Sequence, residues 1–326
     1  MVNRVCFSGV LWRGSHFLPG VIDTLKTLSS LNKKVFYCTN SSTRRPADVV
    51  ERFTKAGLVV DPRTVYTSSS TTAAFLELFA KKNPSVFDIT KDKVFVIGYK
   101  SLLAELRSRG FDAHLSQEVI PSGVSLSSIP LDRSFRAVVV GLDPDMSYAK
   151  CAYAVRLIRE TNALFISTNQ DATYPAAAGV LLPGAGSCVS MVATSSGRAP
   201  LNMGKPSPLM MDAVVEEHGL TRERTLMVGD RRDTDVTFGN TSGMHSMLVF
   251  TGVTSVNDFS LPCVPYQGHP APNVRTSKSP LEVPVIEYAN SVPSSLASGT
   301  HSHDVPTYVA SSVCSLTCDE DLVAKL

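Results

Sequence analysis

Short apolar runs that alternate with helix-forming stretches constrain the fold of this 326-residue chain more than any other feature. Residues 4–10 and 34–38 are β-rich runs, and residues 21–31 between them repeat apolar side chains with helical spacing. A strand, a helix and a second strand in this order predict parallel pairing through a right-handed crossover. The residues that end the two strands, Ser8 and Thr39, are then expected side by side at the carboxyl edge of one sheet.

The same alternation returns in the middle of the chain and again in its last third. The expected elements there are strands over 94–98, 137–141, 163–167, 226–230, 247–250 and 308–310, with helices over 101–109, 149–162 and about 205–217. Because the middle block has its own alternation and enough length, we predict a second α/β domain inserted into the first.

These patterns divide the chain into five predicted segments. They are the first part of a core domain over 1–76, an inserted domain over 77–182, the second part of the core over 183–254, a Pro/Ser-rich insertion over 255–306, and a last core strand with a tail over 307–326. The insertion holds eight of the twenty prolines, and this composition predicts disorder or an extended loop.

Composition excludes several classes of function. The formal net charge is +2, and acidic and basic residues are interspersed. The sequence contains no polybasic block of the kind that would predict a nucleic acid or an anionic membrane as partner. Apolar runs such as 136–142 are far shorter than the roughly 20 residues of a membrane span, so no membrane insertion is expected. Seven scattered cysteines predict reduced thiols. Cys314 and Cys318 lack the further ligands of a zinc set.

The last three residues are Ala324, Lys325 and Leu326, a small residue, a base and a leucine. This tripeptide resembles the Ser-Lys-Leu class of peroxisomal import signal. It predicts a peroxisome or a glycosome as the location and an import receptor as a partner, with the cytoplasm as the alternative.

Four strand-end segments follow one another in the order of a known family. They are residues 9–14, 38–42, 204–207 and 229–235. Their order and spacing resemble the haloacid dehalogenase (HAD) superfamily, in particular its class IIA branch with phosphoglycolate, 4-nitrophenyl and pyridoxal phosphatases. The resemblance continues through 168–171 and 182–186, which are similar to that branch's return from cap to core.

The resemblance implies a fold and an assembly. It implies an α/β fold, with a Rossmann-like HAD core around a parallel sheet and an inserted α/β cap of the C2 type. Some relatives form dimers through the cap, so a homodimer through the cap is an expected partner arrangement.

The family's chemistry implies a role for each matching residue. A first-strand aspartate attacks phosphorus, and a second aspartate two residues later is the general acid and base. By resemblance, Thr39, Asn40 and Ser41 bind phosphate oxygens while Lys205 neutralises their charge. Asp230 is implied as a magnesium ligand, and Asp235 as support for the metal's surroundings.

The first motif departs from the family. The pattern Asp-x-Asp-Gly-Val falls on residues 6–10, where Cys6 and Ser8 replace both aspartates. Sulfur is a poor ligand for magnesium, and a serine hydroxyl is too weak an acid to protonate a leaving group near neutral pH. Since Asp230 and Lys205 carry opposite charges, the remaining set does not demand a metal, and magnesium binding is expected to be weak or absent.

The residues leave three functions open. The favoured one is a pseudophosphatase that holds a small phosphorylated metabolite without hydrolysing it. The second is an active phosphoric monoester hydrolase of the phosphoglycolate or 4-nitrophenyl phosphate type. Attack by a Cys6 thiolate is one route for it, although the nearby Asp230 would oppose ionisation of that thiol. The third is a scaffold in which residues 255–306 recruit a partner.

Overall fold

The computed structural model describes residues 3–6 and 286–287 by their backbone, and residues 10–14, 16–120, 129–176, 180–254, 306–310, 312–314 and 316. The chain divides into two compact units, one of residues 1–37 with 219–326 and one of residues 38–218. The predicted domain boundaries at 76, 182, 254 and 306 stay predictions. Ser8, the C-terminal tripeptide and nearly all of the Pro/Ser-rich segment lie outside the described residues.

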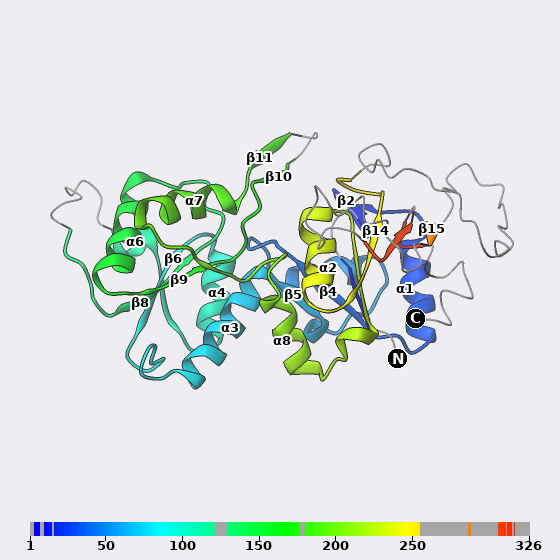
Figure 1. Ribbon diagram of the computed structural model, residues 1–326, viewed down its shortest axis with the longest axis horizontal. Coiled ribbons are helices and arrows are strands. Elements are labelled where there is room, and N and C mark those ends of the chain that lie inside the picture. The colour runs from blue at the N-terminus through cyan, green and yellow to red at the C-terminus, as the bar shows by residue number, and fades with distance from the viewer. Residues whose placement is uncertain are drawn as a thin grey trace, which may run out of the picture. The chain divides into compact units, whose positions relative to one another are not determined.

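The first unit is built on a mostly parallel sheet (Figure 1). Its strands are, in spatial order, β15 (Ile286–Glu287), β16 (Tyr308–Ala310), β14 (His245–Val249), β13 (Thr225–Gly229), β1 (Asn3–Cys6) and β4 (Val35–Thr39), whose last two residues begin the second unit. Every neighbouring pair is parallel except β15 with β16. The predicted parallel sheet is therefore confirmed.

The described part of the first unit also contains two helices, two helical turns and a short hairpin. They are α1 (Val21–Ser30), the 3-10 turn η3 (Arg222–Arg224), the π-helical turn η4 (Arg232–Val236), α9 (Thr237–Thr241) and the hairpin β2 (Trp12–Arg13) with β3 (His16–Phe17). Helix α1 buries Val21, Leu25 and Leu28, which share one face at helical spacing. Strands β13 and β14 are buried along almost their whole length, as expected of inner strands covered on both faces.

The second unit has its own five-stranded sheet, parallel throughout. Its strands are, in spatial order, β12 (Leu201–Asn202), β9 (Leu164–Ser167), β8 (Phe135–Val140), β6 (Lys93–Ile97) and β7 (Asp112–Leu115). The other elements are α2 (Pro46–Lys55), η1 (Pro62–Thr64), β5 (Val65–Thr67), α3 (Ser68–Lys82), α4 (Lys100–Ser108), α5 (Ser116–Val119), α6 (Tyr148–Glu160), the hairpin β10 (Thr173–Pro175) with β11 (Leu181–Pro183), α7 (Ala185–Ser196) and α8 (Leu209–His218).

Alternate side chains of this sheet enter two separate cores. Val94 and Val96 of β6 pack with apolar residues of α3 and α4, whereas Phe95 and Ile97 pack with residues of α6 and α7. Side chains of a strand alternate between its faces, so a sheet with helices on both faces must be apolar at every position. Figure 1 shows the two helical layers around β6, β8 and β9.

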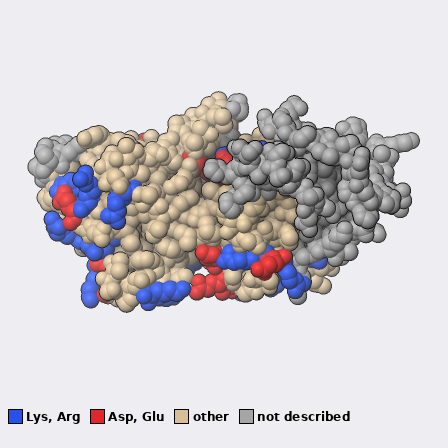
Figure 2. All heavy atoms as spheres, in the orientation of Figure 1, with Lys and Arg blue, Asp and Glu red and all other residues tan. Residues whose placement is uncertain are grey.

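The surface agrees with the interspersed charges of the sequence. Figure 2 shows basic and acidic side chains next to one another on the face it presents, with wide uncharged areas between the groups. Among the helices that the structure describes, none is both long and apolar enough to cross a membrane.

Candidate functional site

The candidate residues fall into two groups, one in each unit. The first group follows β1 and β13, and the second surrounds the turn after β4. Each group is built by its own local hydrogen bonds.

In the first unit, β1 and β13 lie side by side and parallel, with Cys6 level with Val228. Gly229 and Asp230 therefore extend past the level of Cys6 at the carboxyl edge of the sheet. This is the edge where doubly wound sheets bind ligands. The register places the end of β1 beside the loop of Asp230.

Asp230 is buried, with 4% of its surface exposed, and backbone amides hold it. Its carboxylate Oδ2 accepts a hydrogen bond from the Val253 amide at 2.7 Å, and its carbonyl accepts one from the Thr254 amide at 3.0 Å. Gly252 allows this close approach, because a Cβ there would lie 2.0 Å from Asp230 Oδ2. Residue 252 must therefore be glycine for Asp230 to keep this position.

Asp235 supports the loop of Asp230 from η4. Its carboxylate Oδ2 accepts hydrogen bonds from the amides of Asp230 and Arg231, both at 3.1 Å. Gly229 is again the residue that admits this carboxylate, since a Cβ there would lie 2.0 Å from Asp235 Cβ. Partial burial would raise the pKa of Asp233, but two hydrogen bonds from the Arg231 guanidinium lower it below its usual value.

In the second unit, Asn40 joins the turn after β4 to the loop of Lys205. Asn40 Oδ1 accepts from the Lys205 amide at 2.8 Å, and Asn40 Nδ2 donates to the Lys205 carbonyl at 3.0 Å. The Lys205 side chain is buried, and its Nζ donates to the Cys38 carbonyl at 3.4 Å. The structure thus brings Thr39, Asn40, Ser41 and Lys205 together, although Lys205 precedes α8 rather than opening it.

Two residues without a predicted role hold Asn40 as well. Asn169 Nδ2 donates to the Asn40 carbonyl at 2.7 Å, and Asp171 Oδ1 accepts from Asn40 Nδ2 at 3.0 Å. Both belong to the Thr-Asn-x-Asp run at 168–171, which resembled the family's return from cap to core. That run was the signal for their role. The loop of Gly204 packs closely against Asn169, and only glycine permits this, because a Cβ on residue 204 would lie 2.7 Å from Asn169 Cβ.

The side chains of the turn itself remain partly accessible. Thr39 Oγ1 accepts from the Ser41 amide at 3.2 Å, and Ser41 Oγ lies 3.2 Å from Thr43 Oγ1. Thr39, Asn40 and Ser41 are all half-buried, whereas Ser42 is buried. Hydroxyls at such positions can exchange their local hydrogen bonds for bonds to the oxygens of a bound anion.

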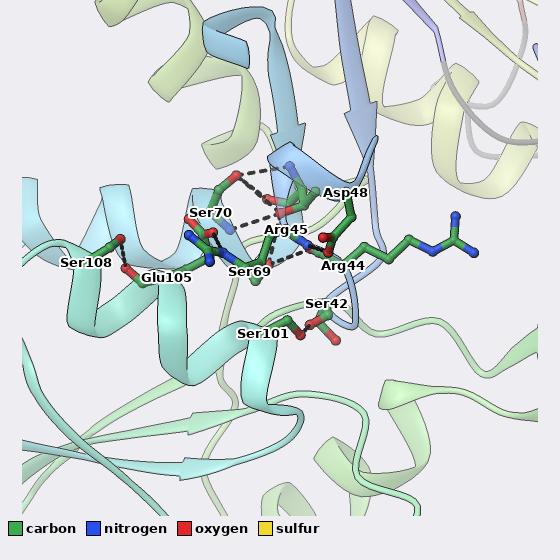
Figure 3. Close-up of polar contacts among 10 residues, drawn as sticks. Ser42, Arg44, Arg45, Asp48, Ser69, Ser70, Ser101, Glu105 and Ser108 are labelled. Carbon is green, nitrogen blue, oxygen red and sulfur yellow. Dashed lines mark hydrogen bonds and ion pairs between the residues drawn. The ribbon is translucent and has the colours of Figure 1, made fainter. Parts of the chain in front are cut away.

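Beyond Ser42 the chain runs into the start of α2 (Figure 3). The Arg45 amide donates to Asp48 Oδ2 at 2.8 Å, which caps that helix. Figure 3 shows the Arg44 side chain extending away from this group of residues. The Arg45 guanidinium instead pairs with Glu105 of α4 at 3.0 Å.

Comparisons with known proteins agree with this arrangement. The family model described as haloacid dehalogenase-like hydrolase matches residues 7–112, and a second model, described as HAD-hydrolase-like, matches residues 202–273. Phosphoglycolate phosphatase 2 of Arabidopsis thaliana is 37% identical over 253 residues, which are 76% of this chain and 81% of that protein.

The chain belongs to the haloacid dehalogenase-like hydrolases. Among solved structures, the p-nitrophenyl phosphatase of Archaeoglobus fulgidus has a TM-score of 0.66 and 28% identity, over 79% of this chain and 88% of that one. The glycerol phosphate phosphatase of Mycobacterium tuberculosis, solved in complex with magnesium, shares the fold with a TM-score of 0.69 and 24% identity, over 98% of this chain and 78% of that one. The predicted HAD fold with a cap, in the phosphoglycolate and nitrophenyl phosphatase branch, is confirmed.

Proposed function

We propose that this haloacid dehalogenase-like protein binds a small phosphorylated metabolite and does not hydrolyse it, which makes it a pseudophosphatase. One contrast carries the proposal. The first strand ends at Cys6, without the family's attacking carboxylate, while the buried Lys205 and the turn of Thr39 and Asn40 keep the family's residues.

Loss of the nucleophile and of the acid–base group supports absence of hydrolysis. The β1 register sets the backbone of Cys6 beside β13, the strand that leads to the buried Asp230. A negative neighbour disfavours ionisation of a thiol, so Cys6 is a poor substitute nucleophile. Ser8 cannot replace a carboxylic acid as proton donor near neutral pH.

The two carboxylates expected at a magnesium site, those of Asp230 and Asp235, already accept hydrogen bonds from backbone amides. Mg²⁺ requires oxygen ligands in near-octahedral order, of which carboxylates supply one or two. Asp235 Oδ2 already accepts two amide hydrogen bonds, and Asp230 Oδ2 accepts one. We therefore propose that magnesium binds weakly or not at all.

Lys205 supports retained phosphate binding. Its side chain is 6% exposed, and a buried ammonium is costly unless anionic or polar partners surround it. Asn40 bonds to both the amide and the carbonyl of Lys205, and the Lys205 amine donates to the carbonyl of Cys38, the residue before Thr39. The amine therefore has a defined place at the turn that carries Thr39 and Ser41, which are half-buried. A compact dianion such as a phosphate monoester matches this set of one cation and several donors.

Hydrolysis is the second candidate, because the relatives named above are phosphatases. One assay separates the two. Turnover of 4-nitrophenyl phosphate with magnesium is measured for the wild type and for the double variant Cys6→Asp/Ser8→Asp. We expect a silent wild type and an active double variant, whose activity Asp230→Asn abolishes again. Robust wild-type turnover that Cys6→Ala removes would overturn the proposal.

Binding is measured separately, by calorimetry with inorganic phosphate on the full chain. We expect the wild type to bind and Lys205→Met to lose about tenfold or more in affinity, the scale of a lost charge-assisted contact. The exposed Lys26 of α1 provides the matched control, since Lys26→Met removes the same charge outside the site. Equal affinities of the two variants would contradict phosphate binding at Lys205.

The peroxisomal or glycosomal location read from Ala324, Lys325 and Leu326 stays a prediction. Deletion of the three residues is expected to abolish import into the organelle. Unchanged import of the shortened chain would contradict it.

A further inference from the structure

The turn that carries Thr39, Asn40 and Ser41 is held along its whole length by side chains from elsewhere in the second unit. The carbonyls of every second residue, 40, 42 and 44, each accept a hydrogen bond from a side chain. The donors and distances are Asn169 Nδ2 to Asn40 at 2.7 Å, Ser68 Oγ to Asn40 at 2.7 Å, Ser101 Oγ to Ser42 at 2.9 Å and Ser69 Oγ to Arg44 at 3.2 Å. The conformation of residues 39–45, the phosphate turn, therefore depends on α3, α4 and the return at 168–171.

Helix α4 supplies the charged contact of this set. Ser101 and Glu105 are one helical turn apart, so they lie on the same face of α4, and Figure 3 shows this face toward residues 42–45. Ser101 binds the Ser42 carbonyl, and Glu105 Oε1 accepts from Arg45 Nε at 3.0 Å. Two contacts from one rigid element fix both the position and the direction of the end of the turn.

The ion pair is better placed than an ordinary surface pair. The Glu105 side chain is 11% exposed, and among the residues that the structure describes Arg45 is the one cation with which it pairs. Arg45 is itself anchored, since its amide donates to Asp48 at the start of α2. A nearly buried carboxylate that loses its cation is left uncompensated, so the pair resists opening more than an exposed one does.

A close backbone approach adds to the same contact. A Cβ on Gly141, at the end of β8, would lie 3.2 Å from Ser42 Oγ and 3.1 Å from Thr168 Oγ1. There is little room for the turn to shift toward the five-stranded sheet. The turn is therefore packed at Ser42 on the side of Gly141 as well as held by Ser101 and Glu105 of α4.

From this geometry we infer that Glu105 is a positioning residue for phosphate binding: through Arg45, and together with Ser101, it holds the phosphate turn in the conformation that presents Thr39 and Ser41 to the ligand. The inference rests on the proposed function. It assigns to α4, inside the segment predicted as the cap, a part in building the phosphate site.

The test measures affinity for inorganic phosphate by calorimetry on the full chain. Glu105→Gln keeps the size of the side chain and removes its charge. Glu77→Gln is the matched control, because Glu77 of α3 pairs with Arg109 and no described contact joins it to residues 39–45. We expect Glu105→Gln to weaken phosphate binding about fivefold to tenfold, the scale of coupling between contacting residues, and Glu77→Gln to stay within about twofold of the wild type.

Two further variants separate positioning from a merely structural role. Arg45→Lys keeps the charge but loses the guanidinium geometry, and as Arg45 is half exposed this variant tests the contact even if Glu105→Gln fails to fold. We expect it to weaken phosphate binding by about the same factor as Glu105→Gln. The charge exchange Arg45→Glu/Glu105→Arg restores an ion pair between the two positions, so it should bind phosphate more tightly than Glu105→Gln and Arg45→Lys and recover most of the affinity that they lose. A general loss of stability would not explain such a recovery.

The outcomes distinguish this inference from the proposed function. A wild type that does not bind phosphate removes the proposed function and the inference with it. A wild type that binds, with Glu105→Gln and Arg45→Lys equal to Glu77→Gln in affinity, overturns the inference alone. Lowered melting temperatures of these two variants with unchanged affinities for phosphate also overturn the inference alone.

Discussion

Replacing Gly252 by alanine tests whether Asp230 occupies the position described. The added Cβ would lie 2.0 Å from Asp230 Oδ2 and 2.5 Å from its Cγ. Ordinary carbon–oxygen contacts are about 3.5 Å, so the carboxylate must move by more than an ångström. That movement breaks the 2.7 Å bond from the Val253 amide to a carboxylate that is 4% exposed.

Two effects set the expected magnitude for Gly252→Ala. Overpacking costs about 1–3 kcal/mol, and loss of a buried hydrogen bond to a charged group costs about 1.5–3 kcal/mol. Since the carboxylate can relax toward other donors, we expect the free energy of unfolding to fall by about 2–4 kcal/mol. At about 2–4 °C per kcal/mol, the melting temperature should fall by roughly 5–15 °C.

The fluorescence of the single tryptophan, Trp12, reports on the unit that contains Gly252. Trp12 belongs to residues 1–37 with 219–326, is buried, and packs edge-on against Phe17 at 5.3 Å between ring centroids. Its fluorescence therefore follows unfolding of the unit that contains Gly252. Val253→Ala is the control, because Val253 is 60% exposed and the variant keeps the backbone donor, so its change should stay within about 0.5 kcal/mol. A Gly252→Ala midpoint equal to the control's would refute the described position of Asp230.

Two further predictions concern the second unit. Burial and the 2.6 Å hydrogen bond to Glu217 both raise the pKa of Tyr66, so Tyr66→Phe should cost about 1–2 kcal/mol in urea unfolding followed by circular dichroism, and no loss would contradict the bond. Hydrogen bonds from Lys81 and Arg109 lower the pKa of Glu77, so its stabilising charge is fully present above the unfolded pKa, near 4.3, and disappears as pH falls through the lower folded value. The stability gap between wild type and Glu77→Gln should shrink in that window, and a constant gap would argue against the pairs.

Buried parallel strands were readable from sequence to within a residue or two. The runs at 94–98 and 226–230 became β6 and β13, because a strand covered on both faces is continuously apolar and stands out in any chain. Strand β7 was not predicted. It reads Asp-Ala-His-Leu, and as an edge strand it leaves Asp112 exposed, so its apolar signal is too short.

Helix α3 shows a different limit of pattern reading. It begins with five consecutive hydroxyl residues, 68–72, which favour turns and caps more than helix interiors. In the structure these residues are buried, and several hydroxyls bond to backbone carbonyls, among them those of Asn40 and Arg44. Contacts with a turn that is distant in sequence stabilise the start of this helix, whereas the helix propensity of its residues does not favour it.

The motifs identified Thr39, Asn40, Ser41, Lys205, Asp230 and Asp235 as candidates, and they exposed the missing aspartates at Cys6 and Ser8. Those conclusions needed only residue types and their order. The sequence did not predict that Asn40 bonds to the loop of Lys205, 165 positions away. It also did not predict that Glu105 pairs with Arg45.

Sequence alone determined the α/β class, the family and the chemistry that the first strand lacks, because apolar periodicity and motif order are properties of the chain itself. The tertiary structure decided which side chains hold the phosphate turn and which glycines admit Asp230 and Asp235. Such contacts depend on distances between segments far apart in the chain, set by the packing of whole helices and sheets, and no local pattern encodes them.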